Sequence, residues 1–189
     1  KEVVDKGCPI TLGGPLPHVI AAKAVAFKEA NTPSFCAYAE QIVKNAQALA
    51  NGLIYHGVHV LTGGTENHLM VFEVSSSLGL TGLQAENALR QAHFTVNRNS
   101  IPFDKNGPWF TSGIRIGTAA LTTLGMKEQE MTQIADWIYL LLKHTKPAKA
   151  EKGNSRSLVD IDSSILKEIQ KHISVLLKRF PLYPDLIFD

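Results

Sequence analysis

Apolar residues recur every three or four positions over residues 131–142 and 165–177, whereas residues 111–117 alternate in the manner of a β-strand. Residues 16–30 are good helix formers and are apolar on nearly all sides. The longer spacing predicts helices and the alternation predicts strands. We therefore expect an α+β fold in which a small mixed sheet is covered by helices and a long helical segment leads into it. The expected helices cover residues 16–30, 32–56, 81–92, 127–143 and about 160–177, and the expected strands cover 58–61, 68–74, 94–96 and 111–117.

Changes in the pattern suggest three segments. Residues 1–57 form a helical segment, with a turn-rich stretch at 7–14, and residues 58–143 form the small α+β domain. Residues 144–189 comprise a linker rich in Lys, Gly and Ser and a C-terminal helix. Within the domain, residues 97–110 contain two prolines and several asparagines and are expected to be a loop long enough to carry function.

Composition narrows the classes of partner. The chain is 44% hydrophobic and 19% charged with a formal net charge of +2, which is typical of a globular protein. It has no run of four basic residues, so we expect neither nucleic acid nor a membrane as a partner. Cys8 and Cys36 show no metal or redox spacing, which favours a cytoplasmic setting. Residues 1–6 resemble neither a signal peptide nor a translation start, so we expect the chain to begin within a longer protein.

The strand expected at 111–117 carries the most informative polar residue, Arg115. Ile114 and Ile116 must share the core face, which turns Arg115 to the opposite face between Gly113 and Gly117. With no side chains at those glycines, a ligand could lie against the backbone while the planar guanidinium binds its carboxylate with two hydrogen bonds. An arginine on a solvent-exposed strand face, with glycines marking bulges, is the alternative.

Gly13 and Gly14 precede the first long helix. Free amides and the positive end of a helix dipole make such a position suitable for an anion such as phosphate. A plain tight turn into the helix fits the same residues, because no established phosphate-binding glycine motif accompanies them.

Other polar residues are less specific. Asn99 could bind an amide-bearing ring edge or could be solvated loop polarity, and the segment containing Glu66 and His68 is best explained as a hairpin turn. The seven histidines lack metal-ligand spacing, so no metal site is expected. No nucleophile elbow or Ser-His-Asp pattern is present.

Four separate motifs, in order, resemble serine hydroxymethyltransferase. They are Gly13-Gly14-Pro15-Leu16 with His18-Val19-Ile20-Ala21, Gly63-Gly64-Thr65 with Asn67-His68, Thr95-Val96-Asn97 with Asn99 and Pro102, and the segment from Thr111 to Thr118. The resemblance covers about residues 8–143, extends to Arg179-Phe180-Pro181-Leu182-Tyr183, and corresponds to the C-terminal portion of the family.

The resemblance implies a fold-type-I transferase dependent on pyridoxal 5'-phosphate, acting as a homodimer or a dimer of dimers. Such an enzyme interconverts serine plus tetrahydrofolate and glycine plus methylenetetrahydrofolate. By motif, Arg115 would bind the substrate carboxylate, Gly13 and Gly14 would bind the cofactor phosphate of the neighbouring subunit, and Asn99 would contact the folate.

The departures from the family are equally informative. The family's Schiff-base lysine, in a Thr-Thr-His-Lys run ahead of the glycine pair, has no counterpart here, and Cys8 to Leu12 replace the usual residues before Gly13. The resemblance thus assigns no catalytic residue to this chain and implies a missing N-terminal cofactor domain. We expect the intact parent to be the enzyme and this fragment to be inactive and free of cofactor. The alternative is a non-catalytic dimerisation or amino-acid-binding module derived from the same family.

Overall fold

The structure is a computed structural model that describes residues 1–11, 13–151 and 153–183 of the 189-residue chain. It divides into two units, Lys1–Ala39 and Glu40–Asp189. Among the described residues, no helix has both the length and the apolar content that crossing a bilayer requires.

The first unit is helical. It contains α1 (Glu2–Thr11), α2 (Pro17–Ala30) and the beginning of α3 (Pro33–Tyr55). The helices predicted at 16–30 and 32–56 are confirmed. The helix α2 begins at a proline, which loses no hydrogen bond there because first-turn amides have no partner within the helix. The prediction of turns from Gly7 is wrong as far as Thr11, because acidic residues in the first turn of α1 and the Glu2–Lys6 ion pair of 3.2 Å favour the helix.

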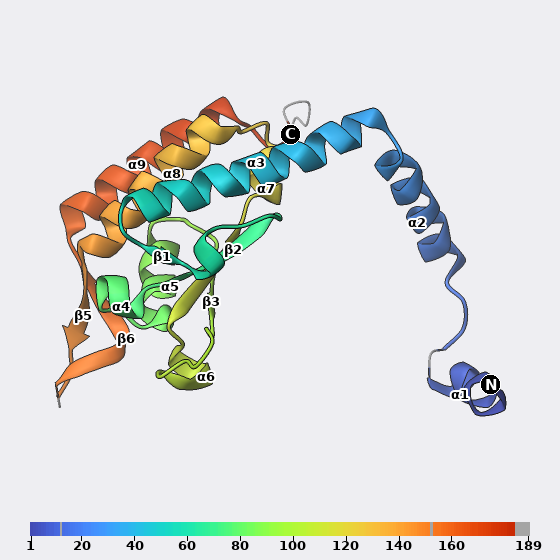
Figure 1. Ribbon diagram of the computed structural model, residues 1–189, viewed down its shortest axis with the longest axis horizontal. Coiled ribbons are helices and arrows are strands. Elements are labelled where there is room, and N and C mark those ends of the chain that lie inside the picture. Colours follow the sequence, from blue (N-terminus) through green and yellow to red (C-terminus); the bar gives the residue numbers. More distant parts are fainter. Residues whose placement is uncertain (12, 152, 184–189) are drawn as a thin grey trace, which may run out of the picture. The chain divides into compact units, whose positions relative to one another are not determined.

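A four-stranded antiparallel sheet with the order β1-β2-β4-β3 lies at the centre of the second unit (Figure 1). The predicted hairpin is formed by β1 and β2, which are joined through the 3-10 turn η1. The strands are β1 (His59–Val60), β2 (Leu69–Glu73), β3 (Asn97–Asn99) and β4 (Gly113–Gly117), and η1 spans Leu61–Gly63.

Helices cover one face of this sheet, and the α+β class is confirmed. The expectation of a mixed sheet is wrong, because each strand pair described in it is antiparallel. Two long helices are amphipathic as their spacing predicts, and the predicted capping box at Thr81 and Gln84 is present. The helices of this unit besides α3 are α4 (Ser75–Leu78), α5 (Gly82–Gln91), α6 (Gly107–Phe110), α7 (Ala119–Thr123), α8 (Glu128–Lys143) and α9 (Ser163–Arg179).

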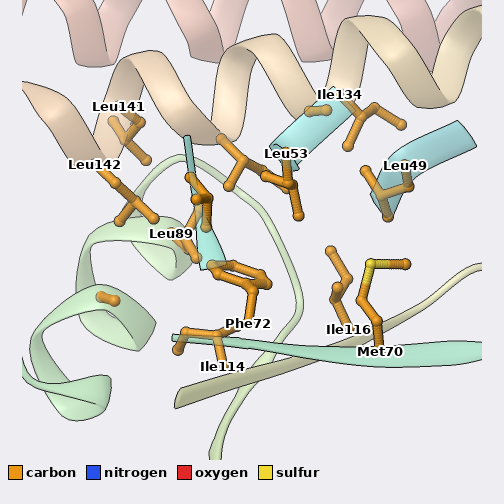
Figure 2. Close-up of a cluster of buried hydrophobic side chains, with 14 of the residues drawn as sticks. Leu49, Leu53, Met70, Phe72, Leu89, Ile114, Ile116, Ile134, Leu141 and Leu142 are labelled. Carbon is orange, nitrogen blue, oxygen red and sulfur yellow. The ribbon is translucent and has the colours of Figure 1, made fainter. Parts of the chain in front are cut away.

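The hydrophobic core fills the space between one face of the sheet and the helices (Figure 2). Alternate residues of β2 and β4 point into it, and leucines of α3, α5 and α8 meet them. Phe72 is the largest of the fully buried side chains. The opposite face of β2 and β4 is therefore the one available to ligands. The buried side chains of this core that Figure 2 shows are Leu49, Leu53, Met70, Phe72, Leu89, Ile114, Ile116, Ile134, Leu141 and Leu142.

The predicted strand at 94–96 is wrong, and β3 begins three residues later at Asn97. The apolar Phe94 and Val96 indicated a strand, but both are half-buried against the core without pairing. Strand pairing instead involves a polar Asn-Arg-Asn segment at the edge of the sheet.

The segment whose composition suggests a linker contributes to a two-stranded sheet of β5 (Thr145–Lys149) and β6 (Asn154–Ile161). Side chains of α5 and of its N-cap Thr81 hold β6 by donating to its backbone carbonyls: Thr81 Oγ1 to Arg156, Gln84 Nε2 to Ser155 and Asn87 Nδ2 to Ser157. These long-range hydrogen bonds order a segment that has few apolar residues of its own.

Candidate functional site

Arg115 lies on the outer face of the central sheet, as the strand alternation predicts. Ile114 and Ile116 on either side of it are buried, whereas Arg115 is exposed. The register places it between Val71 of β2 and Asn97 of β3. The sheet therefore presents the guanidinium away from the core, on a rigid central strand.

Within the part of the chain that the structure describes, one side-chain hydrogen bond orients the guanidinium: Arg115 Nε donates to Asn97 Oδ1 at 3.1 Å. Within the described residues, Arg115 forms no ion pair. Its charge is consequently not neutralised by a protein carboxylate and is available to an anionic ligand.

The expectation of bare backbone on both sides of Arg115 is wrong at one of the two glycines. A Cβ added at Gly113 would come within 2.7 Å of Ile101 Cγ2 and 2.9 Å of the Asn99 carbonyl, so that space is already filled. At Gly117 the nearest atom, the His68 carbonyl, would be 3.1 Å away. Gly113 is thus required for close packing under the 100–112 loop. A ligand can approach Arg115 along the side of Gly117 or from the solvent that faces the outer side of the sheet.

Asn99 belongs to the same sheet as Arg115. It pairs with Gly113 across β3 and β4, two residues along the edge strand from Asn97. Its side chain is half-buried and its Nδ2 donates to the Ser100 carbonyl at 2.7 Å, which leaves the Oδ1 side of the amide for a ligand donor.

The loop after Asn99 is organised by Asp104. This carboxylate accepts hydrogen bonds from Ser112 Oγ at 2.6 Å and from the backbone amides of Ser112, Asn106 and Ile101. Burial alone would raise the pKa of Asp104, but the hydrogen bonds from Ser112 and the amides together lower the pKa below its ordinary value of 3.8. The ionised carboxylate of Asp104 therefore stabilises the loop that joins β3 and β4.

We expect Asp104→Asn to lower the free energy of unfolding by about 1–2 kcal/mol at neutral pH, because an amide cannot accept four hydrogen bonds. Since the pKa is lowered in the folded state, the ionised carboxylate contributes its full stability above pH 3.8, and that contribution is lost as the pH falls through the folded-state pKa. Urea unfolding of both proteins should show a gap that narrows below pH 3.8. Asp160→Asn, at an exposed carboxylate, is the matched control, and an equal loss from both variants would contradict the assignment.

The Gly63–His68 segment is a turn, in agreement with the simpler interpretation. Thr65 Oγ1 donates to the Leu69 carbonyl at 2.6 Å, and Asn67 Oδ1 accepts from the Leu69 amide at 2.9 Å. Glu66 and His68 are exposed, and their side chains form no hydrogen bond or ion pair with each other. This turn borders an open hollow of about 780 Å³ that also includes Leu69 and Val71, the residue paired with Arg115. The hollow is large enough for a small ligand, but Arg115 is not among the residues that line it.

Gly13 and Gly14 lie in the first unit, whereas Arg115 and Asn99 share the sheet of the second unit. Gly13 has a φ of +70°, a conformation that favours glycine, and a Cβ added at Gly13 or Gly14 would meet no atom within 4 Å. Both residues are exposed and lie just ahead of the 14-residue helix α2. The described residues contain no cluster of three side chains suited to a metal ion.

Sequence analysis quoted Asn97 within a family motif but gave it no role, and it did not single out Asp104. Asn97 stands two positions from Asn99, so both must share one face of a strand, and recognising β3 would have placed it beside Arg115. For Asp104 no such spacing signal exists, because loop geometry brings Ser112 to it.

Comparison with known proteins gives one family. A family model described as "Serine hydroxymethyltransferase" matches residues 3–138. The serine hydroxymethyltransferase of Treponema pallidum is 50% identical over 186 residues, which are 98% of this chain and 32% of that protein. That of Salinispora tropica is 50% identical over 184 residues, which are 97% of this chain and 38% of that protein. For the Chlamydia trachomatis protein the identity is 48% over 186 residues, 98% of this chain and 37% of that protein. The chain thus spans about a third of the length of the curated relatives it matches.

Proposed function

Because this chain belongs to the serine hydroxymethyltransferase family, we propose that it forms the substrate-carboxylate and folate side of an active site that interconverts serine and glycine. The remaining parts of that site come from a cofactor domain and from a second copy in a homodimer. Tetrahydrofolate is the proposed one-carbon acceptor, with Asn99 contacting it.

One observation carries this proposal: the guanidinium of Arg115 lies on the outer face of β4 and, among the described residues, forms no ion pair. With Nε bonded to Asn97, the two terminal nitrogens form a planar fork that matches the two oxygens of a carboxylate. An amino acid held by its carboxylate is fixed in position and orientation for reaction at its other bonds.

Pyridoxal phosphate is the proposed cofactor. When bound, it supplies an electron sink for the bonds at the amino acid Cα. Gly13 and Gly14 would hold its phosphate through their backbone amides. The chain has no lysine in a Thr-Thr-His-Lys run to anchor the cofactor, so we propose that the chain alone is inactive.

A chimera tests this function. The matching 186 residues of the Treponema pallidum enzyme are replaced by this chain, and serine–glycine interconversion is measured for the chimera, the parent enzyme and the chain alone. We expect activity from the chimera, because half of the matched residues are identical, and none from the chain. A folded, dimeric chimera without activity would favour the non-catalytic module instead, and activity in the isolated chain would contradict its proposed inactivity.

A further inference from the structure

Asn97 is the residue whose side chain touches the Arg115 guanidinium. We propose that Asn97 is a positioning residue, which sets the plane of the guanidinium and reserves its terminal nitrogens for the substrate carboxylate. This inference rests on the proposed function and extends it to a residue of the edge strand.

The orientation of the Asn97 amide is determined by its own hydrogen bonds. Its Nδ2 donates to the Arg98 carbonyl at 2.9 Å, and its Oδ1 accepts from Arg115 Nε at 3.1 Å. The flipped amide would direct two donors at Nε–H and an acceptor at a carbonyl, so only one orientation satisfies both partners. Asn97 therefore offers Arg115 an acceptor and no competing donor.

This contact restricts how Arg115 can bind a carboxylate. A guanidinium can grip a carboxylate through Nε and one terminal nitrogen or through both terminal nitrogens. Because Asn97 occupies Nε, only the fork of the two terminal nitrogens remains, and the ligand must lie beyond the tip of the side chain. The acceptor is neutral, so the arginine keeps its full charge for the substrate, which an aspartate at this position would partly neutralise.

The backbone that holds Asn97 is itself braced from the other face of β3. Arg98 Nη1 pairs with Glu86 Oε2 at 2.6 Å, and Arg98 Nε donates to the Trp109 carbonyl at 3.0 Å. Glu86 is buried in α5, with 8% of its side chain exposed. These bonds fix an edge strand that is only three residues long, and with it the Arg98 carbonyl that orients the Asn97 amide.

The test uses the chimera described above with Asn97→Ala and Asn97→Asp, and measures KM for serine and kcat. We expect Asn97→Ala to raise KM about tenfold, the effect of one hydrogen bond to a charged group, with little change in kcat. We expect Asn97→Asp to raise KM about 100-fold, because the added charge competes with the substrate carboxylate for Arg115. Asn87→Ala removes an asparagine that only holds β6, and it is expected to leave KM unchanged.

The order of the two variants separates positioning from a structural role. Aspartate keeps an acceptor for Nε but loses the donor that Nδ2 supplies to the Arg98 carbonyl, so a purely structural role predicts that both variants lose stability and change KM alike. A KM for Asn97→Asp no higher than that for Asn97→Ala, or an unchanged KM in both variants, would overturn the inference. If Arg115→Lys leaves KM unchanged as well, the carboxylate role of Arg115 itself fails; if Arg115→Lys raises KM and the Asn97 variants do not, only the positioning role fails.

Discussion

Arg115→Ala in the chimera is expected to raise KM for serine about 1,000-fold, because removing one partner of a charge-paired contact costs about 4 kcal/mol. Arg115→Lys is expected to raise KM about 30-fold, because lysine keeps the charge but loses the planar fork. Steady-state kinetics over a wide range of serine concentration would measure both effects. Arg115 is exposed, and among the described residues its side chain bonds to Asn97 alone, so we expect neither change to affect folding appreciably.

Arg90→Lys is the matched control for this experiment. Among the described residues, Arg90 also reaches one side chain, Glu86 at 3.3 Å, but its own side chain is 70% exposed and it lies on α5, away from the outer face of the sheet. We expect the KM for serine of the Arg90→Lys chimera to equal that of the unaltered chimera. A serine KM for Arg115→Ala within threefold of the unaltered value would remove Arg115 from the site, since one hydrogen bond to a charged group is already worth about tenfold.

Phe72→Ala is expected to lower the free energy of unfolding by about 4 kcal/mol, the usual cost of deleting a buried aromatic ring. Phe72 is fully buried on the core face of β2 and lies among leucines of α3, α5 and α8 and Ile114 of β4 (Figure 2). No single neighbour can move into the vacated space without disturbing the others. Because small domains have only about 5–15 kcal/mol of total stability, the variant should unfold at a much lower urea concentration, as followed by circular dichroism.

Two controls give this result its meaning. Phe72→Leu retains much of the buried volume and should cost clearly less than Phe72→Ala. Leu158→Ala, at a leucine of β6 that is 63% exposed, should change stability by less than about 0.5 kcal/mol. A similar loss from Phe72→Ala and Leu158→Ala would show that the core does not depend on Phe72.

Local sequence signals predicted most of the helices correctly. The Thr81–Gln84 capping box marks the start of α5, and Asp162 caps α9 by accepting from the Ser164 amide at 2.9 Å. Both caps involve residues two or three positions apart, so the chain carries the information within a single turn. Alternation was equally reliable for β4, where Ile114 and Ile116 are buried and Arg115 is not.

Sequence reasoning did not predict β3 or the pairing of β5 with β6. The residues of β3 are all polar, and its place in the sheet depends on Arg98 reaching Glu86, which is twelve residues away in the chain. The strand β6 depends in the same way on side chains of α5 more than 70 residues distant. Neither signal exists until the chain has folded.

In the candidate site, too, some features follow from the sequence and others depend on the folded structure. The sequence alone determined that Arg115 turns away from the core, because alternation is a property of any strand, and its motifs indicated the family. Only the tertiary structure decided that Gly113 is filled by Ile101, that Asn97 bonds to Nε of Arg115, and that Asp104 ties the intervening loop to Ser112. Spacing along the chain specifies the face of an element, whereas contacts between elements depend on distances that arise only when those elements pack together.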